Sequence, residues 1–202
     1  MISPFDVAVL ILAAGTSSRM GTFKPLIPMG GLPLIERIVG KYRAAGIERI
    51  MTVVGHRADR LIPVLEGLGV GWTMNPEYRE EMITSIKTGL EKLHPPLKAF
   101  YLQPGDMPFV RWETIGKLLA SFDPEGMDLL RPRHAGRRGH PVLISASGIP
   151  SIKAYSGPGG LRGLVESGGW RVLDLDVRDP GILIDLDTPE DLEAASKLLD
   201  ST

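Results

Sequence analysis

The sequence has no cysteine, almost no net charge and no long apolar run, and each absence excludes a class of protein. Without cysteine there is no disulfide, no thiolate metal site and no cysteine nucleophile, which fits a reducing compartment. The 23 Lys and Arg against 24 Asp and Glu leave no electrostatic sign of nucleic acid as a partner. The N-terminus lacks a basic region, and the apolar run over residues 7–14 is too short to cross a bilayer. We therefore expect a cytoplasmic protein that binds neither nucleic acid nor membrane.

What is present is the composition of an ordinary globular protein, 43% hydrophobic and 23% charged. A length of 202 residues suits one α/β domain with a full core. The 24 glycines and 17 prolines are spread along the chain as punctuation, so no linker divides it. We expect a single domain over residues 1–202, acting as a monomer.

Strand and helix patterns alternate along most of the chain. Apolar runs predict strands over residues 7–13, 49–54, 70–74 and 99–103. Helical spacing predicts helices over residues 34–45, 59–65, 82–92 and 112–121. Shorter strands over 128–131, 141–145 and 172–175 indicate a partly antiparallel extension, and a strand over 182–186 and a helix over 189–199 end the chain. The alternation predicts a three-layer α/β/α, Rossmann-like fold with a mostly parallel sheet.

The loop after the first strand is rich in small and polar residues, and ligands of such sheets bind at the carboxyl ends of the strands. It reads Leu12-Ala13-Ala14-Gly15-Thr16-Ser17-Ser18-Arg19-Met20-Gly21, and Lys24 follows. Small residues let backbone N–H groups approach an anion, and Arg19 and Lys24 add two positive charges. The loop therefore suits a polyphosphate, although a polar turn with two surface cations has the same composition.

The order Leu-Ala-Ala-Gly-x-Ser-x-Arg-Met-Gly-x-x-Lys resembles the signature of the MobA-like nucleotidyltransferases, which include the molybdenum cofactor cytidylyltransferases and guanylyltransferases. The resemblance implies a fold of the nucleotide-diphospho-sugar transferase type. It implies that the backbone over Leu12, Ala13, Ala14 and Gly15 contacts the base, and that Arg19 and Lys24 hold the triphosphate. Ala14 stands where the guanylyl branch has glycine, which favours CTP as the donor.

A second motif, Gln103-Pro104-Gly105-Asp106-Met107-Pro108, follows the strand over residues 99–103. A carboxylate at that edge of the sheet can hold Mg²⁺ against phosphate oxygens, or it can simply stabilise a Gly-Asp turn. The resemblance makes Asp106 the main metal ligand, although the cytidylyl branch more often has Ala-Asp-Gln-Pro here. We expect Asp106 to converge with Arg19 and Lys24 on one triphosphate.

The last motif, Asp185-Leu186-Asp187-Thr188-Pro189-Glu190-Asp191, contains two acids that share one face if the strand is regular. The resemblance makes Asp185 the better second metal ligand. Asp187 is interpreted as a helix-capping residue beside Thr188.

Three polar residues, Asn75, Thr84 and Ser85, precede or open the helix over 82–92. The resemblance places them in the nucleotide site, while helix capping by either hydroxyl is the alternative. Glu81 stands where the family has glycine.

Residues 131–175 are expected to form the acceptor side. The resemblance assigns Arg138 and His140, in Arg138-Gly139-His140-Pro141-Val142, to acceptor binding. A purely structural histidine and solvated arginines at 131, 133, 137 and 138 remain the alternative.

Together these motifs predict a Mg²⁺-dependent enzyme that transfers a nucleotide, CMP from CTP, to the phosphate of the molybdopterin cofactor and releases pyrophosphate. Positioning and charge neutralisation can carry such a reaction without a covalent intermediate. One alternative is a related enzyme that uses GTP or a sugar or alcohol phosphate. The other is a non-catalytic nucleotide-binding module that delivers a cofactor to a molybdoenzyme or its chaperone.

Overall fold

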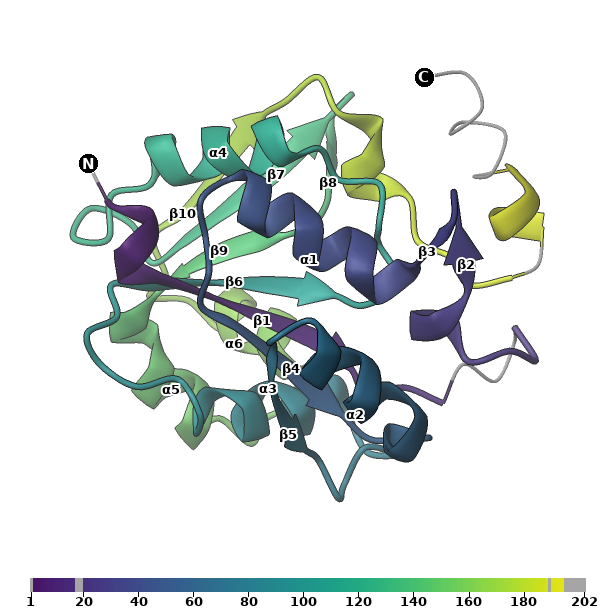
Figure 1. Ribbon diagram of the computed structural model, residues 1–202. Coiled ribbons are helices and arrows are strands. Elements are labelled where there is room, and N and C mark those ends of the chain that lie inside the picture. The colour runs from purple at the N-terminus through teal and green to yellow at the C-terminus, as the bar shows by residue number, and fades with distance from the viewer. Residues whose placement is uncertain (1, 17–19, 189, 195–202) are drawn as a thin grey trace.

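The computed structural model describes residues 2–16, 20–188 and 190–194. It has three layers, with one sheet between two layers of helices (Figure 1). The sheet has eight strands in the order β10-β7-β9-β6-β1-β4-β5, with β8 paired to β7. Its strands are β1 (Val7–Ala13), β4 (Ile50–Val54), β5 (Gly71–Met74), β6 (Ala99–Pro104), β7 (Leu129–His134), β8 (Arg137–Arg138), β9 (Val142–Ser145) and β10 (Val172–Asp176). The expected three-layer α/β/α fold is thus confirmed.

The sheet is mostly parallel, as predicted. β6, β1, β4 and β5 run in one direction. β9 is antiparallel to both of its neighbours, β6 and β7, so β7 and its parallel partner β10 return to the direction of β6. The carboxyl ends of six strands therefore lie along one edge of the sheet, and only β9 and the short β8 oppose them.

Two apolar cores hold the helices onto the sheet, because the aliphatic residues of β1 point alternately to its two faces. Val7, Val9 and Ile11 pack in the layer of α1 (Leu34–Ala44), α2 (Ala58–Gly67) and α4 (Trp112–Ser121). Ala8 and Leu10 pack in the layer of α3 (Met82–Leu90), α5 (Ile149–Ala154) and α6 (Gly160–Glu166). A small hairpin of β2 (Pro28–Met29) and β3 (Leu32–Pro33) lies beside the sheet edge that carries the site (Figure 1).

The prediction of a strand over residues 182–186 is wrong. A 3-10 helix, η4 (Pro180–Leu183), occupies part of that segment, and its backbone bonds to loops instead of a neighbouring strand. The Ile182 carbonyl oxygen accepts from His140 N at 3.0 Å, and Leu186 N donates to the Asp106 carbonyl oxygen at 3.0 Å. The apolar residues that suggested a strand are buried singly, Ile182 against the sheet and Leu186 against the β2–β3 hairpin.

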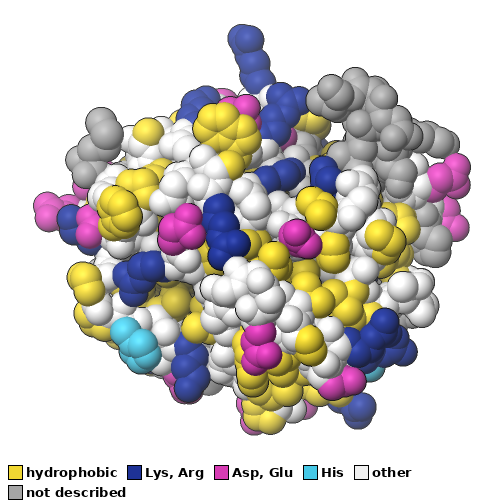
Figure 2. Space-filling model, in the orientation of Figure 1, with side chains coloured by type: hydrophobic (Ala, Val, Ile, Leu, Met, Phe, Trp, Pro, Cys, Tyr) yellow, Lys and Arg dark blue, Asp and Glu magenta, His cyan; other side chains and the backbone are white. Residues whose placement is uncertain are grey.

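The end of the chain and the surface complete the fold. Residues 190–194 are helical, and the rest of the helix predicted over 189–199 lies outside the described residues. No helix among the described residues is long and apolar enough to cross a membrane. The face shown in Figure 2 mixes Lys and Arg with Asp and Glu, in keeping with the net charge of −1.

Candidate active site

The candidate site lies where β1, β4 and β6 end, and two glycines let the following loops pack against the end of β1. Gly105 N donates to the Leu12 carbonyl oxygen at 2.9 Å, and a Cβ on Gly105 would lie 2.7 Å from the same oxygen. A Cβ on Gly55 would lie 2.8 Å from the carbonyl oxygen of Ala14. Ala13 and Ala14 are buried here and Gly15 is exposed. The loops that follow β4 and β6 therefore pack against residues 12–14 of the predicted base-contacting segment, and Gly15 remains exposed.

Lys24 and Asp106, which the sequence placed in one site, lie together with Asp187. Lys24, at the start of η2 (Lys24–Leu26), has its Nζ 2.6 Å from Asp187 Oδ1 and 3.5 Å from Asp106 Oδ2. The side chain of Lys24 is 12% exposed, that of Asp187 is 33% exposed and that of Asp106 is 32% exposed. One cation and two carboxylates from three distant segments thus form a half-buried cluster. Arg19, the other predicted cation, lies outside the described residues.

The electrostatics of this cluster depend on burial. Removal from water disfavours the charged form of a carboxyl. Burial accordingly raises the pKa of Asp106, the positive charge of Lys24 opposes that rise, and the negative charge of Asp187 adds to it. The nearby Lys24 therefore favours the charged form of Asp106, which burial disfavours.

Of the two acids in the last motif, Asp187 and not Asp185 faces Lys24. Asp185 is exposed, whereas the Asp187 carboxylate bonds Lys24. The two side chains were expected to share one face of a regular strand, and the segment is not a strand. The interpretation of Asp187 as a helix cap is wrong as well, because Thr188 and Asp191 form that cap. Asp191 Oδ2 accepts from Thr188 N at 2.8 Å, and Thr188 Oγ1 accepts from Asp191 N at 3.2 Å.

A buried carboxylate that sequence reasoning missed, Asp179, joins η4 to the start of α4. Its Oδ2 accepts from Arg111 N at 2.9 Å and Thr114 Oγ1 at 2.7 Å, and its Oδ1 accepts from Gly181 N at 2.9 Å. Asp179 is only 2% exposed. The Asp-Pro-Gly order at 179–181 signals a turn, but nothing local identifies partners 65 and 68 residues away.

Asn75, Thr84 and Ser85 also lie together, as one hydrogen-bonded group beside α3. Asn75 Nδ2 donates to Thr84 Oγ1 at 3.0 Å and to Ser85 Oγ at 2.9 Å. Helix capping by these hydroxyls is not observed, because α3 begins at Met82 and no side chain caps it. Asn75 is 1% exposed, so it braces the loop that leads to α3.

The expected acceptor side contains a cavity of about 760 Å³ lined by both predicted residues, Arg138 and His140, and by Arg131. Its apolar wall consists of Ile83, Ile86, Leu102, Leu129, Val142, Leu161 and Val165. Arg131 Nε and Arg138 Nε donate to the two carboxylate oxygens of Asp174 at 2.8 and 2.9 Å. The rim is therefore less basic than its arginines alone suggest.

His140 connects this cavity to the carboxylate cluster. Burial lowers the pKa of His140, while a hydrogen bond to the Leu102 backbone and the charge of Asp106 oppose that change. Its Nδ1 is buried and has no hydrogen-bond partner among the described residues. The lowered pKa favours the neutral form of the His140 imidazole.

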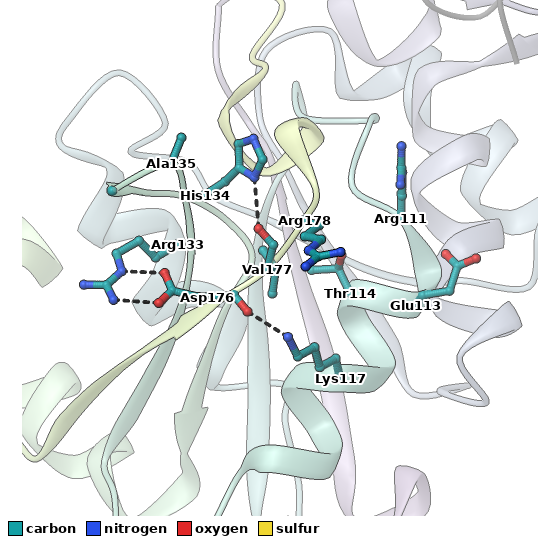
Figure 3. A pocket seen from close by; sticks show the side chains of 11 residues that line it. Arg111, Glu113, Thr114, Lys117, Arg133, His134, Ala135, Asp176, Val177 and Arg178 are labelled. Atoms are coloured by element: carbon teal, nitrogen blue, oxygen red, sulfur yellow. Dashed lines mark hydrogen bonds and ion pairs between the residues drawn. The ribbon is translucent and has the colours of Figure 1, made fainter.

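Of the arginines at 131, 133, 137 and 138, Arg131 and Arg138 line the cavity of His140 and Arg133 lines a different one. Arg133 lies in a second cavity of about 790 Å³ at the ends of β7, β10 and the start of α4, shown in Figure 3. There it forms a two-point ion pair with Asp176, at 2.7 and 2.8 Å, and Lys117 Nζ donates to the Asp176 carbonyl oxygen (Figure 3). His134 bonds the Val177 carbonyl oxygen in the same cavity. Neither this cavity nor that of His140 is lined by Asp106 or Lys24, and of the two only the cavity of His140 contains the predicted residues Arg138 and His140.

The donor set suits Mg²⁺ supplied with substrate phosphates. The described residues contain no group of three or more His, Cys, Asp or Glu side chains able to enclose a metal by themselves. Mg²⁺ usually takes one or two protein carboxylates and completes its shell with water and phosphate oxygens. Asp106 and Asp187 match that requirement, since both already face a single cation, Lys24 Nζ.

Lys41 is a half-buried lysine near the site whose ionisation links stability to pH. It lies on α1, and its Nζ donates to the Pro108 carbonyl oxygen. Burial, with a smaller contribution from Arg37, lowers the pKa of Lys41 from 10.5 to about 8.

We expect the free energy of unfolding of the wild type, relative to Lys41→Met, to rise by about 3 kcal/mol between pH 7.5 and 10.5. Between pH 8 and 10.5 the unfolded chain binds the Lys41 proton more tightly than the native protein does, so increasing pH stabilises the native state. Urea unfolding of both proteins across this range measures the difference and cancels the titration of other groups. A difference independent of pH would contradict the lowered pKa of Lys41.

The fold and this cluster of a lysine and two carboxylates, beside the carboxyl ends of a mostly parallel sheet, suit a nucleotidyltransferase. The family model described as the MobA-like NTP transferase domain matches residues 9–172. The chain belongs to this family.

Individual relatives agree with that assignment. The molybdenum cofactor cytidylyltransferase of Escherichia coli (strain K12) is 26% identical over 189 residues, which cover 93% of this chain and 94% of that protein. The bifunctional protein GlmU of Marinobacter nauticus is 32% identical over 126 residues, but these cover 60% of this chain and only 27% of GlmU. The crystal structure of Rv0371c from Mycobacterium tuberculosis H37Rv matches with a TM-score of 0.80 and 25% identity, covering 95% of this chain and 98% of that one. Rv0371c has also been solved in complex with manganese.

Proposed function

We propose that the chain transfers CMP from CTP to the terminal phosphate of the molybdopterin cofactor and releases pyrophosphate. The observation that carries the proposal is the cluster of Lys24, Asp106 and Asp187 at the carboxyl ends of the strands. The cytidylyltransferase relative supports the choice of reaction, since it matches this chain over nearly the full length of both proteins. The protein would act in the cytoplasm as a monomer and pass its product to a molybdoenzyme or its chaperone.

In the proposed reaction an oxygen of the acceptor phosphate attacks the α-phosphorus of CTP in line with the leaving group. The new bond joins that oxygen to phosphorus, and the bond between the α-phosphorus and the bridging oxygen breaks with its electron pair leaving on pyrophosphate. Lys24 and Arg19 would bind the triphosphate and stabilise the departing pyrophosphate. Asp106 and Asp187 would hold Mg²⁺, which neutralises charge on the phosphate oxygens when bound. No group on the protein needs to form a covalent intermediate.

The proposed nucleotide site extends from the cluster along the end of β1. The backbone of Leu12–Gly15 would contact the cytosine, and the group of Asn75, Thr84 and Ser85 would shape the neighbouring wall. Arg138 and His140 would face the acceptor, whose phosphate must reach the cluster from the cavity of about 760 Å³. The apolar wall of this cavity suits a flat organic acceptor that carries an anionic phosphate.

The decisive experiment measures pyrophosphate release by the purified protein with Mg²⁺, molybdopterin cofactor and each of CTP, GTP, UTP and ATP. We expect release with CTP at a rate at least ~10-fold above that with GTP, because a pocket shaped for one base leaves polar groups unpaired with another. Thermal shifts with the same four nucleotides check binding separately from turnover. Nucleotide binding without pyrophosphate release would contradict an enzymatic role and favour a non-catalytic nucleotide-binding module. Faster release with GTP than with CTP would identify GTP as the nucleotide donor.

A further inference from the structure

The segment that contains Asp106, residues 104–108 (the Asp106 loop), accepts hydrogen bonds from neighbouring side chains at its backbone carbonyl oxygens. Gln103 Nε2 donates to the carbonyl oxygens of Pro104 at 2.7 Å and Met107 at 3.2 Å, one on each side of Asp106. Lys41 Nζ donates to the next carbonyl oxygen, that of Pro108, at 2.5 Å. The side chains of Gln103 and Lys41 thus hold three backbone carbonyl groups close to the Asp106 carboxylate.

Gln103 in turn receives its orientation from Tyr42 on α1. Tyr42 OH donates to Gln103 Oε1 at 2.9 Å, and both residues are only 1% exposed. A side-chain amide has an acceptor at one end and two donors at the other. Because Tyr42 binds the acceptor end, the donor end must face the loop carbonyls. Without the phenol, the amide is free to turn and set its oxygen against those carbonyls, which would repel it.

Removing the polar groups of Tyr42, Gln103 and Lys41 from water is costly unless they form hydrogen bonds. The bonds that they form hold the Asp106 loop, directly for Gln103 and Lys41 and through Gln103 for Tyr42. We propose that Tyr42, Gln103 and Lys41 are positioning residues, which set the Asp106 carboxylate at the distance from Asp187 and Lys24 that metal and triphosphate binding require. This inference rests on the proposed role of Asp106 as a metal ligand. Side chains that orient metal ligands through hydrogen bonds alter metal affinity when they are removed, typically ~10–100-fold.

The chain offers a matched control for Tyr42. Tyr101 is 0% exposed in the same core layer, its ring lies 5.4 Å from that of Tyr42, and its OH donates to the Ile115 carbonyl oxygen at 2.7 Å, on α4. Tyr42→Phe and Tyr101→Phe each delete one buried phenol hydroxyl that donates a hydrogen bond. Only the first deletion releases the Asp106 loop.

We expect both phenylalanine variants to unfold at similarly lowered temperatures, and only Tyr42→Phe to lose metal affinity and turnover. The Kd of Mn²⁺, measured from the electron paramagnetic resonance of free Mn²⁺ with and without CTP, should rise about 10-fold in Tyr42→Phe. It should stay at the wild-type value in Tyr101→Phe. The kcat for pyrophosphate release should fall by a similar factor in Tyr42→Phe alone.

Lys41→Met is a second variant that releases the loop at another carbonyl. Methionine fills a similar volume without a buried charge, so below pH 8 it should be at least as stable as the wild type while its Mn²⁺ affinity falls. If Lys41 had only a structural role, Lys41→Met would not lower Mn²⁺ affinity while leaving the stability of the protein unchanged or higher.

The inference is overturned if Tyr42→Phe and Lys41→Met match Tyr101→Phe in both Mn²⁺ affinity and kcat. It is also overturned if the wild type binds no Mn²⁺ under these conditions. If the wild type binds Mn²⁺ but releases no pyrophosphate, the proposed reaction fails, while a Kd raised in Tyr42→Phe alone still supports the positioning role.

Discussion

Asp106→Asn should lower kcat/KM for pyrophosphate release by about 1000-fold, equivalent to about 4 kcal/mol of transition-state stabilisation. Asparagine keeps the size and shape of the side chain but removes its charge, so it is a poor ligand for Mg²⁺ and a poor partner for Lys24. Asp106 faces both Lys24 and the charge of Asp187, and it belongs to a loop whose backbone is fixed. A neighbouring group cannot easily replace it.

The fold should tolerate this change. Burial raises the pKa of Asp106, which means that the charged carboxylate is poorly solvated where it lies. The neutral amide avoids that penalty, and the loop backbone keeps its bonds to Gln103, Lys41 and Leu186. Circular dichroism and thermal unfolding should therefore match the wild type within a few degrees. A folded Asp106→Asn protein with wild-type kcat/KM would exclude Asp106 from the metal site.

Asp187→Asn should lower kcat/KM about 100-fold, while Asp185→Asn should leave it within about 2-fold of the wild type. The same chemical change is made at positions two residues apart, so each variant controls for the other. Asp187 lies 2.6 Å from Lys24 Nζ, whereas Asp185 is exposed to solvent. Steady-state kinetics and Mn²⁺ titration of both variants measure the difference. Loss of activity in Asp185→Asn with an active Asp187→Asn would restore the assignment that the motif suggested.

The carboxylate of Asp174 partly neutralises the positive charge at the rim of the His140 cavity. Arg131 and Arg138 share the carboxylate of Asp174, which is mostly buried, and Asp174 has a lowered pKa despite its burial because both guanidinium groups donate to it. In the proposed reaction an anionic acceptor would meet a rim that is partly neutralised, so its phosphate would find most of its positive charge at Lys24 and the proposed metal.

Much of the architecture could be predicted from the sequence because it depends on local patterns. The aliphatic run of β1 suits only a strand buried on both faces, and the apolar spacing of α1, α3 and α4 matches a helix facing a sheet. The order of strands and helices then restricts the sheet to a mostly parallel one. Lys24 and Asp106 could be placed together because both follow strands whose carboxyl ends share one edge.

What only the tertiary structure decided depends on contacts between distant segments. The choice of Asp187 over Asp185 followed from the absence of a strand at 182–186, where the backbone bonds to loops instead. Tyr42 and Gln103 are 61 residues apart, and Asp179 and Thr114 are 65 apart, so no periodicity along the chain reveals that they bond. The sequence by itself determined which elements form and which edge of the sheet carries the chemistry. The packing of one element on another determined which carboxylates face the lysine, because a buried polar group takes whichever partner the fold brings within reach.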